Sequence, residues 1–170
     1  MGKQPPRQSV SGSGRRVALV VARFNPEITG ALADGARAAL VDCGVLEEDI
    51  HEYEVAGAFE LAPACRQLVA VGPEVDAIVA LGAVVRGETP HFDFVAQAAA
   101  QGLQRLAGEI NVALSFGVLT TDTLEQARER ADRTRSDRGG EAARAAIEQV
   151  ALFESLRESR KSMIRGFRLS

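Results

Sequence analysis

The stretch RGETPHFDF, residues 86–94, places one of the two histidines of the chain between a polar, glycine-bearing loop and a run with helical character. Thr89 suits a helix N-cap and Pro90 suits the first helical position, so we expect His91 in the first turn of a helix. The amides of the preceding loop would then lie where a helix N-terminus gathers an anion, phosphate above all. Histidine also changes charge near neutral pH. The segment therefore predicts an anion site beside an acid/base group.

Position in the chain leaves a second interpretation of His91 open. A histidine can also hydrogen-bond a neighbour and take no part in chemistry. The other histidine, His51, lies in a run that alternates with charged residues, where we expect it on the surface.

The segments RFN and AGAFE contain residue types suited to a polar ligand with a planar ring. Phe24 would either stack on such a ring at the rim of a sheet or pack in the core. Ala58 permits close approach of a ligand to the backbone, and Glu60 either accepts hydrogen bonds from hydroxyl groups or only complements a helix dipole. The arginines within residues 128–138 fit ion pairs at helical spacing, so none by itself predicts a phosphate site.

Four short runs with apolar or alternating patterns predict strands at residues 17–22, 50–55, 76–85 and 111–120. Amphipathic runs between and after them predict helices at residues 26–43, 60–70, 91–108, 124–132 and 140–161. In the first helix, Asn25 fits the N-cap, Pro26 the first position and Gly44 the exit. Asp122 and Glu125, three residues apart, predict a capping box before the fourth helix.

Strands that alternate with helices predict a parallel sheet covered on both faces and joined by right-handed crossovers. The predicted fold is a three-layer α/β sandwich, flavodoxin-like, with a four-stranded parallel sheet flanked by helices on both faces. Ligands of such folds bind at the carboxyl ends of the strands. This rule gathers the segments RFN, AGAFE, RGETPH and TTD at one edge of the sheet.

Composition excludes several classes of function. The net charge of -3 gives no reason to expect a nucleic-acid surface over the whole molecule. Cys43 and Cys65 form neither a CxxC pair nor a Cys/His cluster, so we expect free thiols and no metal site. No apolar run approaches the roughly 20 residues of a membrane span, and the first residues lack the apolar segment of a secretory signal. The sequence predicts a cytoplasmic protein with no membrane partner.

The pattern also divides the chain. Residues 1–14 have the composition of a disordered arm. Residues 15–158 are predicted to form the domain, and residues 159–170 a basic tail that is solvated or partly helical.

Taken together, five segments resemble the 6,7-dimethyl-8-ribityllumazine synthase family of riboflavin biosynthesis. They are ARFNPEITGALADGA, VAGAFELAPACRQL, DAIVALGAVVRGETPHFDFVA, FGVLTTDTLEQARERA and GGEAARAAIE, and they occur in the family's order. The pairing of GAVVRGETPHFD with GVLTTD is the most specific part. The resemblance implies a transferase that condenses 5-amino-6-(D-ribitylamino)uracil with 3,4-dihydroxy-2-butanone 4-phosphate, with no metal and no organic cofactor.

The same resemblance implies roles for individual residues. His91 would donate and accept protons, and Phe24 would stack on the pyrimidine ring. Residues implied to bind the ribitylaminouracil are Phe24, Asn25, Ala58, Phe59, Glu60, Ala83, Val84, Val85 and Phe116. Residues implied to hold the phosphate are Glu88 and Thr89, through their backbone amides, and Arg130, with Arg138 as a further candidate.

Family resemblance also implies an assembly. Members build the site between adjacent subunits of a homopentamer, and Phe116 aligns with the residue that the neighbouring subunit contributes. Extra residues between the last two helices accompany free pentamers, and residues 131–139 show no obvious insertion, which is compatible with a 60-subunit icosahedral shell. Riboflavin synthase is the protein partner that the resemblance allows.

Two departures from the family pattern lie near the implied site. Ala56 stands where proline is usual in the family. Arg138 stands where lysine is common, so a planar guanidinium replaces a compact ammonium group at that position. Two alternatives keep the fold: a non-catalytic paralogue that binds flavin or lumazine or forms a shell, and the archaeal type of riboflavin synthase. A nucleotide-binding regulator is a generic third alternative, but the sequence has neither a P-loop nor a GxGxxG motif.

Overall fold

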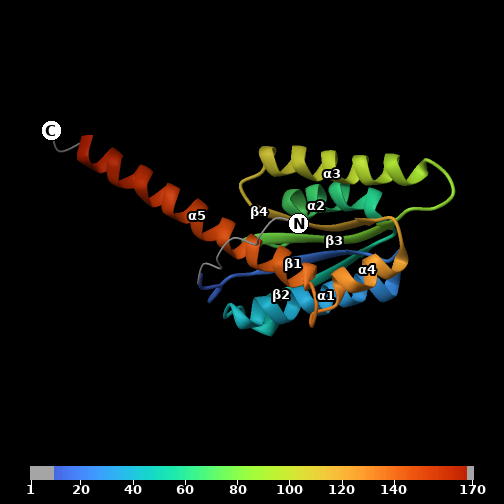
Figure 1. The fold of residues 1–170 in the computed structure, drawn as a ribbon. Helices are drawn as coiled ribbons and strands as arrows, with labels where there is room; N and C mark the ends of the chain where they lie inside the picture. Colours follow the sequence, from blue (N-terminus) through green and yellow to red (C-terminus); the bar gives the residue numbers. More distant parts are fainter. Residues whose placement is uncertain (1–9, 168–170) are drawn as a thin grey trace.

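The computed structural model describes residues 10–167 and the side-chain environments of residues 10–161. Strands and helices alternate along the chain (Figure 1). The strands are β1 (Val17–Ala22), β2 (Ile50–Val55), β3 (Ala77–Val85) and β4 (Ala113–Thr121). The helices are α1 (Pro26–Asp42), α2 (Leu61–Val71), α3 (His91–Glu109), α4 (Leu124–Ala131) and α5 (Arg138–Phe167), with short 3-10 turns η1 (Glu47–Asp49) and η2 (Ala58–Glu60).

The four strands form one parallel sheet in the order β2-β1-β3-β4. Val17 of β1 lies opposite Ile50 on one side and Ala77 on the other. Every residue of β1 is buried, and so is β3 up to its last residue, as expected of strands covered on both faces. The predicted fold class is confirmed.

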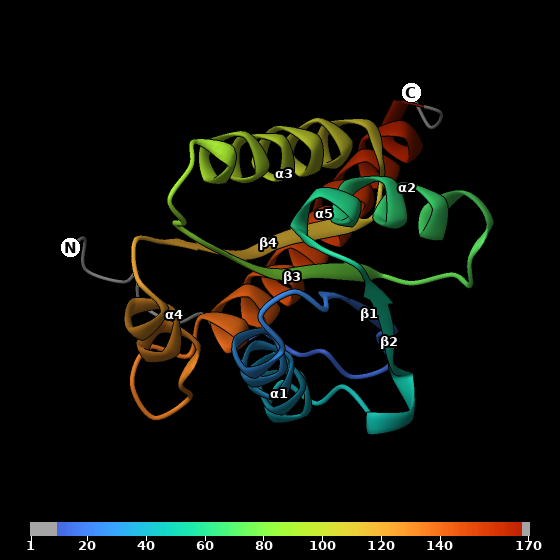
Figure 2. The ribbon, with the colours of Figure 1, turned by 90° about the vertical axis from the view of Figure 1, so that its right-hand side faces the viewer.

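Alternate residues of the strands pack into two separate cores. On one face, Leu19 of β1 lies in a cluster with residues of α1 and with Ile147 of α5. On the other face, Val20 joins Leu61 of α2 and Leu106 of α3. Figures 1 and 2 show this arrangement, with α2 and α3 on one side of the sheet and α1 and α4 on the other. The period of two in a strand is what sends neighbouring residues to opposite cores.

The sheet order reverses between β1 and β3. From β1 the chain moves outward to β2, and it then crosses back to place β3 on the other side of β1. At such a point the loops that leave the two central strands turn to opposite faces, which opens a crevice beyond their carboxyl ends. Three of the four predicted segments, RFN, AGAFE and RGETPH, meet at this crevice, whereas TTD does not line it.

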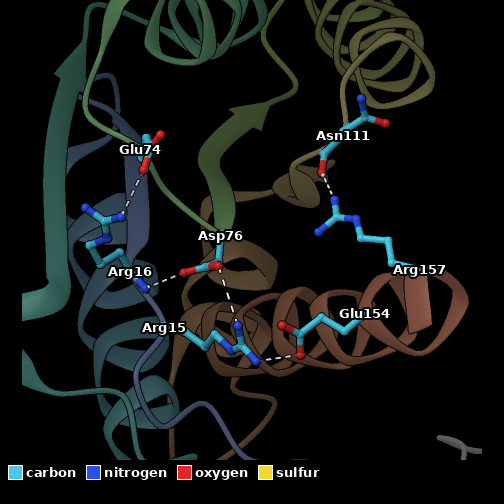
Figure 3. Close-up of polar contacts among 7 residues, drawn as sticks. All are labelled: Arg15, Arg16, Glu74, Asp76, Asn111, Glu154 and Arg157. Carbon is cyan, nitrogen blue, oxygen red and sulfur yellow. Dashed lines mark hydrogen bonds and ion pairs between the residues drawn. The ribbon is translucent and has the colours of Figure 1, made fainter. Parts of the chain in front are cut away.

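Polar contacts at the opposite, amino end of the sheet hold α5 in place (Figure 3). The guanidinium of Arg15 lies 3.7 Å from Asp76, which precedes β3, and also hydrogen-bonds Glu154 of α5. One turn further along α5, Arg157 donates to the carbonyl oxygen of Asn111 at 3.0 Å. These contacts fix the part of α5 that leaves the sheet, and its last turns project beyond the body of the domain (Figure 1).

Two helix starts differ from the predictions. Pro90, not Thr89, occupies the N-cap of α3, so the predicted cap is wrong by one residue, whereas His91 begins the helix as the predicted range 91–108 has it. The cap of α4 is Thr123, whose hydroxyl accepts the backbone N–H of Gln126. The predicted capping box of Asp122 and Glu125 is therefore wrong by one position: the Gln126 side chain closes it by accepting the N–H of Asp122 at 3.0 Å.

The last helix is longer than predicted. It begins at Arg138, and it continues through residue 158 to Phe167 without a break. The limits of 15 and 158 for the domain stay a prediction. Residues 1–9 of the predicted arm and 168–170 of the predicted tail lie outside the described residues.

Candidate active site

A pocket of about 470 Å³ opens at the carboxyl end of the sheet, at the reversal point between β1 and β3. Its walls come from the segments that follow β1, β2 and β3 and from the first turns of α3. The predicted site residues that line it are Phe24, Asn25, Ala58, Phe59, Glu60, Ala83, Val84, Val85, Thr89 and His91. The tertiary structure thus brings three distant loops into one concave site.

Two aromatic rings of the pocket are largely exposed. The exposed fraction is 71% for Phe24 and 61% for Phe59. The backbone N–H of Phe24 donates to the carbonyl oxygen of Ala56 at 3.2 Å, so the chain is fixed there while the ring stays outside the core. Core packing of Phe24 is excluded, and an exposed ring beside a cavity suits stacking on a planar ligand.

Asn25 connects two walls of the pocket. It occupies the N-cap of α1 in the left-handed conformation, with φ of 60°, and its side chain makes no capping hydrogen bond. The predicted N-cap position is therefore confirmed, but the side chain does not cap the helix. The Nδ2 group instead donates to the carbonyl oxygen of Ala83 in β3 at 3.0 Å. Asparagine tolerates the left-handed region better than most residues, which explains how this residue type serves here.

Glu60 shapes the wall formed by η2. Its Oε2 accepts the backbone N–H of Gly57 at 2.9 Å, which closes the turn between β2 and α2. The carboxylate is exposed and lines the pocket beside Ala58. A carboxylate held in this way can still accept hydrogen bonds from ligand hydroxyl groups, because it has about four acceptor positions.

The loop before α3 presents its backbone to the pocket. Within the described chain, the amides of Gly87, Glu88 and Thr89 donate to no backbone carbonyl or side chain. Gly87 and Thr89 line the pocket together with the exposed His91, and a Cβ at Gly87 would meet nothing within 4 Å. Unpaired amides at the start of a helix suit an anion. The imidazole of His91 lies where it could exchange protons beside that anion.

Comparison with known proteins agrees with this geometry. A sequence model of 6,7-dimethyl-8-ribityllumazine synthase matches residues 14–154. Proteins of that name are 46% identical in Gemmatimonas aurantiaca (84% of this chain, 87% of the relative) and 48% identical in Anaeromyxobacter sp. (strain Fw109-5) (90% and 91%). A third, from Desulfosudis oleivorans, is 44% identical over 85% of this chain and 92% of its own length.

The chain belongs to the 6,7-dimethyl-8-ribityllumazine synthase family. The long match covers every segment that forms the pocket, from β1 to the start of α3, and continues through α4 into α5.

Phe116, which the lumazine synthase resemblance assigned to the site, does not line the pocket of its own chain. It lies in the edge strand β4, 47% exposed, in a shallow groove against α3 that includes Gln104 and Leu114. An exposed aromatic ring on an edge strand is suited to contact with another chain.

The charged residues assigned to phosphate also lie outside the pocket lining. Arg130 on α4 donates to the carbonyl oxygen of Gln126 at 3.2 Å, and Arg138 donates to Glu141 at 2.6 Å. The side chain of Glu88 is exposed and does not line the pocket. Among the described residues, no arginine or lysine lines the pocket, so its candidate anion-binding groups are the loop amides and His91.

The pocket is also lined by residues that were not in the predicted set. Phe92 and Val95 extend the apolar wall, and Gly57 and Gly87 bring backbone to the surface of the cavity. A helical repeat could have identified Phe92 and Val95, because His91, Phe92 and Val95 lie within one turn of α3.

The described helices include none with the length and the apolar composition of a membrane span. No group of three or more His, Cys, Asp or Glu side chains among these residues could hold a metal ion. Cys43 and Cys65 are both free thiols, and burial raises the pKa of Cys65 to about 12.

Proposed function

We propose that the chain catalyses the lumazine synthase reaction in the pocket between β1 and β3. The reaction condenses 5-amino-6-(D-ribitylamino)uracil with 3,4-dihydroxy-2-butanone 4-phosphate to 6,7-dimethyl-8-ribityllumazine, the penultimate step of riboflavin biosynthesis, and releases phosphate and water. The observation that carries the placement is the convergence of the exposed ring of Phe24, the unpaired loop amides and His91 on one cavity.

The pyrimidine occupies the apolar end of the cavity. Phe24 stacks on its ring, and backbone groups of Ala83, Val84 and Val85 at the end of β3 bond its edge. The ribityl chain lies along Asn25, Ala58, Phe59 and Glu60, where the carboxylate accepts from its hydroxyl groups. The support for these roles is that all of these residues line the cavity.

The phosphate lies against the start of α3. The amides of Glu88 and Thr89 donate to its oxygens, with the positive end of the helix behind them. His91, one residue beyond Pro90, is then close to the carbon from which phosphate departs. This position suits the proton donor and acceptor of the reaction.

The chemical steps follow in order. The 5-amino group attacks the ketone, and loss of water forms a Schiff base. Phosphate then leaves with its bonding electrons as a neighbouring proton is removed, and the ribitylamino nitrogen closes the second ring with loss of water. His91 moves protons in these steps, which contributes about 10²-fold or more. The remaining acceleration comes largely from holding two substrates together.

A neighbouring subunit completes the site. We assign Phe116 and Arg130 to the pocket of the adjacent chain in a homopentamer, because neither lines the pocket of its own chain while Phe24 and Phe59 remain open. Arg138 is a further candidate for the same phosphate. Pentamers could stand alone or build a 60-subunit shell, and riboflavin synthase, which consumes the product, is the protein partner we propose.

A direct assay tests this function. Purified protein is mixed with the ribitylaminouracil and the butanone phosphate, and lumazine absorbance and phosphate release are followed together. We expect both signals in equal amounts. Analytical ultracentrifugation of the same sample distinguishes a pentamer, a decamer and a 60-subunit shell. A well-assembled oligomer that forms no lumazine would contradict the proposal and would favour a flavin-binding or shell-forming role.

Archaeal-type riboflavin synthase is tested in the same experiment. That enzyme converts two lumazine molecules without a phosphorylated substrate. Incubation with lumazine alone should give no riboflavin if the loop at the start of α3 serves a phosphate.

A further inference from the structure

Arg86, which separates β3 from the loop that carries the unpaired amides, contacts each structural element around that loop. Its backbone N–H donates to the carbonyl oxygen of Thr121 at the end of β4, at 2.9 Å. Its Nε donates to Oδ1 of Asp122 at 2.7 Å, and Nη2 lies 3.6 Å from Oδ1 of Asp93 in the first turn of α3. The guanidinium also lies over the ring of Phe92, 4.3 Å from its centroid.

Two of these contacts involve the residues that directly follow the candidate catalytic histidine. Asp93 and Phe92 are the two residues that follow His91 in α3, and Phe92 lines the pocket. Asp122 precedes the cap of α4, the helix that carries Arg130. Arg86 therefore connects the first turn of α3, through Asp93, with the β4–α4 junction, through Thr121 and Asp122.

The guanidinium of Arg86 already interacts with carboxylates of its own chain. It faces two carboxylates, and the pKa of the guanidinium is raised mainly by the hydrogen bond to Asp122. The side chain does not line the pocket. An arginine committed to two carboxylates is a poor ligand for a phosphate, because its planar donors are already directed elsewhere.

We propose that Arg86 is a positioning residue that holds the loop of residues 87–90 and the first turn of α3 in the geometry in which His91 and the loop amides act. This inference rests on the proposed function, since it concerns the same pocket. Both Arg86 and Asp122 are substantially exposed, at 46% and 68% of the side chain, so the pair adds little to global stability. Its effect is local, on the alignment of groups that must lie within about an ångström of their working positions.

The experiment compares Arg86→Gln, Asp122→Asn and their double variant. We expect each single variant to lose about ten-fold in kcat, the double variant to lose no more than Arg86→Gln, and the melting temperature to stay nearly constant. The matched control is Arg128→Gln, which removes a bidentate bond to Glu27 of α1 at 2.8 and 3.0 Å with 45% and 65% exposure. It should keep kcat within two-fold or so of the wild type.

A second readout does not depend on activity. Two bonded amides flank the loop, since residue 86 donates to Thr121 at 2.9 Å and Asp93 donates to Pro90 at 3.0 Å. Hydrogen exchange of these two amides should be about ten-fold faster in Arg86→Gln and Asp122→Asn than in the wild type, and unchanged in Arg128→Gln. If the wild type makes no lumazine, the proposed function fails while exchange still tests the positioning. Unchanged exchange and unchanged kcat in Arg86→Gln would overturn the inference. So would a rise in KM for the butanone phosphate alone with no effect of Asp122→Asn, because that result would make Arg86 a direct phosphate ligand.

Discussion

The side-chain amide of Asn25 donates a hydrogen bond to the carbonyl oxygen of Ala83 at 3.0 Å, and this bond joins the ends of the two central strands. The bond lies where the strand order reverses, and both of its residues line the pocket of the candidate site. Asn25 makes this bond with its backbone in the left-handed conformation, with φ of 60° and ψ of 59°.

Two substitutions separate the hydrogen bond from the backbone strain at this position. Asn25→Gly removes the bond but tolerates the left-handed conformation, which should cost about 1 kcal/mol of unfolding free energy. Asn25→Ala adds the strain of a Cβ in that region and should cost roughly 1 kcal/mol more. Thermal unfolding at matched protein concentration measures both. Equal losses would show that the backbone is not strained.

Replacement of His91 should affect the chemical step and leave binding largely intact. We expect His91→Ala to lower kcat by about 10²-fold, with a much smaller change in KM for the butanone phosphate, because the loop amides remain. Steady-state kinetics with each substrate varied in turn make the measurement. Undiminished turnover would remove His91 from the mechanism.

Sites shared between subunits should permit complementation. Suppose that His91→Ala and Phe116→Ala are each nearly inactive, and that the two chains are co-expressed in equal amounts. About a quarter of the sites in a mixed ring should then combine an intact His91 with an intact neighbouring Phe116. Specific activity near that fraction of the wild type is the expected result. Activity no higher than that of the separate variants would place Phe116 outside the site.

Gly139 of α5 packs against the backbone of α1. A Cβ there would lie 2.0 Å from the carbonyl oxygen of Leu32, whereas a Cβ at Gly30, also in α1, would meet nothing within 4 Å. Gly139→Ala should therefore destabilise the protein by about 2 kcal/mol or more, since backbone must move. Gly30→Ala should be neutral or stabilising by up to about 1 kcal/mol. Chemical denaturation measures the unfolding free energy of both variants. Equal values for the two would contradict the close packing at Gly139.

Cys65 should make the folded state sensitive to alkaline pH. Burial raises the pKa of its thiol to about 12, from an ordinary value of 9.0, so the folded protein retains a proton that the unfolded chain loses. Its contribution to stability is complete below pH 9 and declines as the pH rises toward 12. The loss should reach about 2 kcal/mol by roughly pH 10.5.

The Cys65→Ala variant isolates this contribution. Its unfolding free energy should fall less steeply above pH 9 than that of the wild type, in denaturant titrations at a series of pH values. Parallel curves for the two proteins would show that the thiol does not titrate differently in the folded and unfolded states.

Local sequence patterns determined the elements and their order. Continuous apolar runs predicted β1 and β3 because strands covered on both faces need no alternation, and Pro26 and Gly44 marked the ends of α1 as their backbone preferences require. The alternation of strand and helix was enough to predict a parallel sheet, and the carboxyl-end rule then predicted where RFN, AGAFE and RGETPH would meet.

Tertiary structure decided which polar groups face one another, because those contacts join residues far apart in the chain. Asn25 has the residue type of a cap, yet its amide bonds Ala83, which is 58 positions away. Asp122 was predicted to begin a capping box. Its carboxylate instead accepts a hydrogen bond from Arg86, which follows β3, while Thr123 and Gln126 form the cap. Phe116 and Arg130 lie outside the pocket of their own chain, because Phe116 is in the edge strand β4 and Arg130 is on α4, and the local sequence does not reveal this separation.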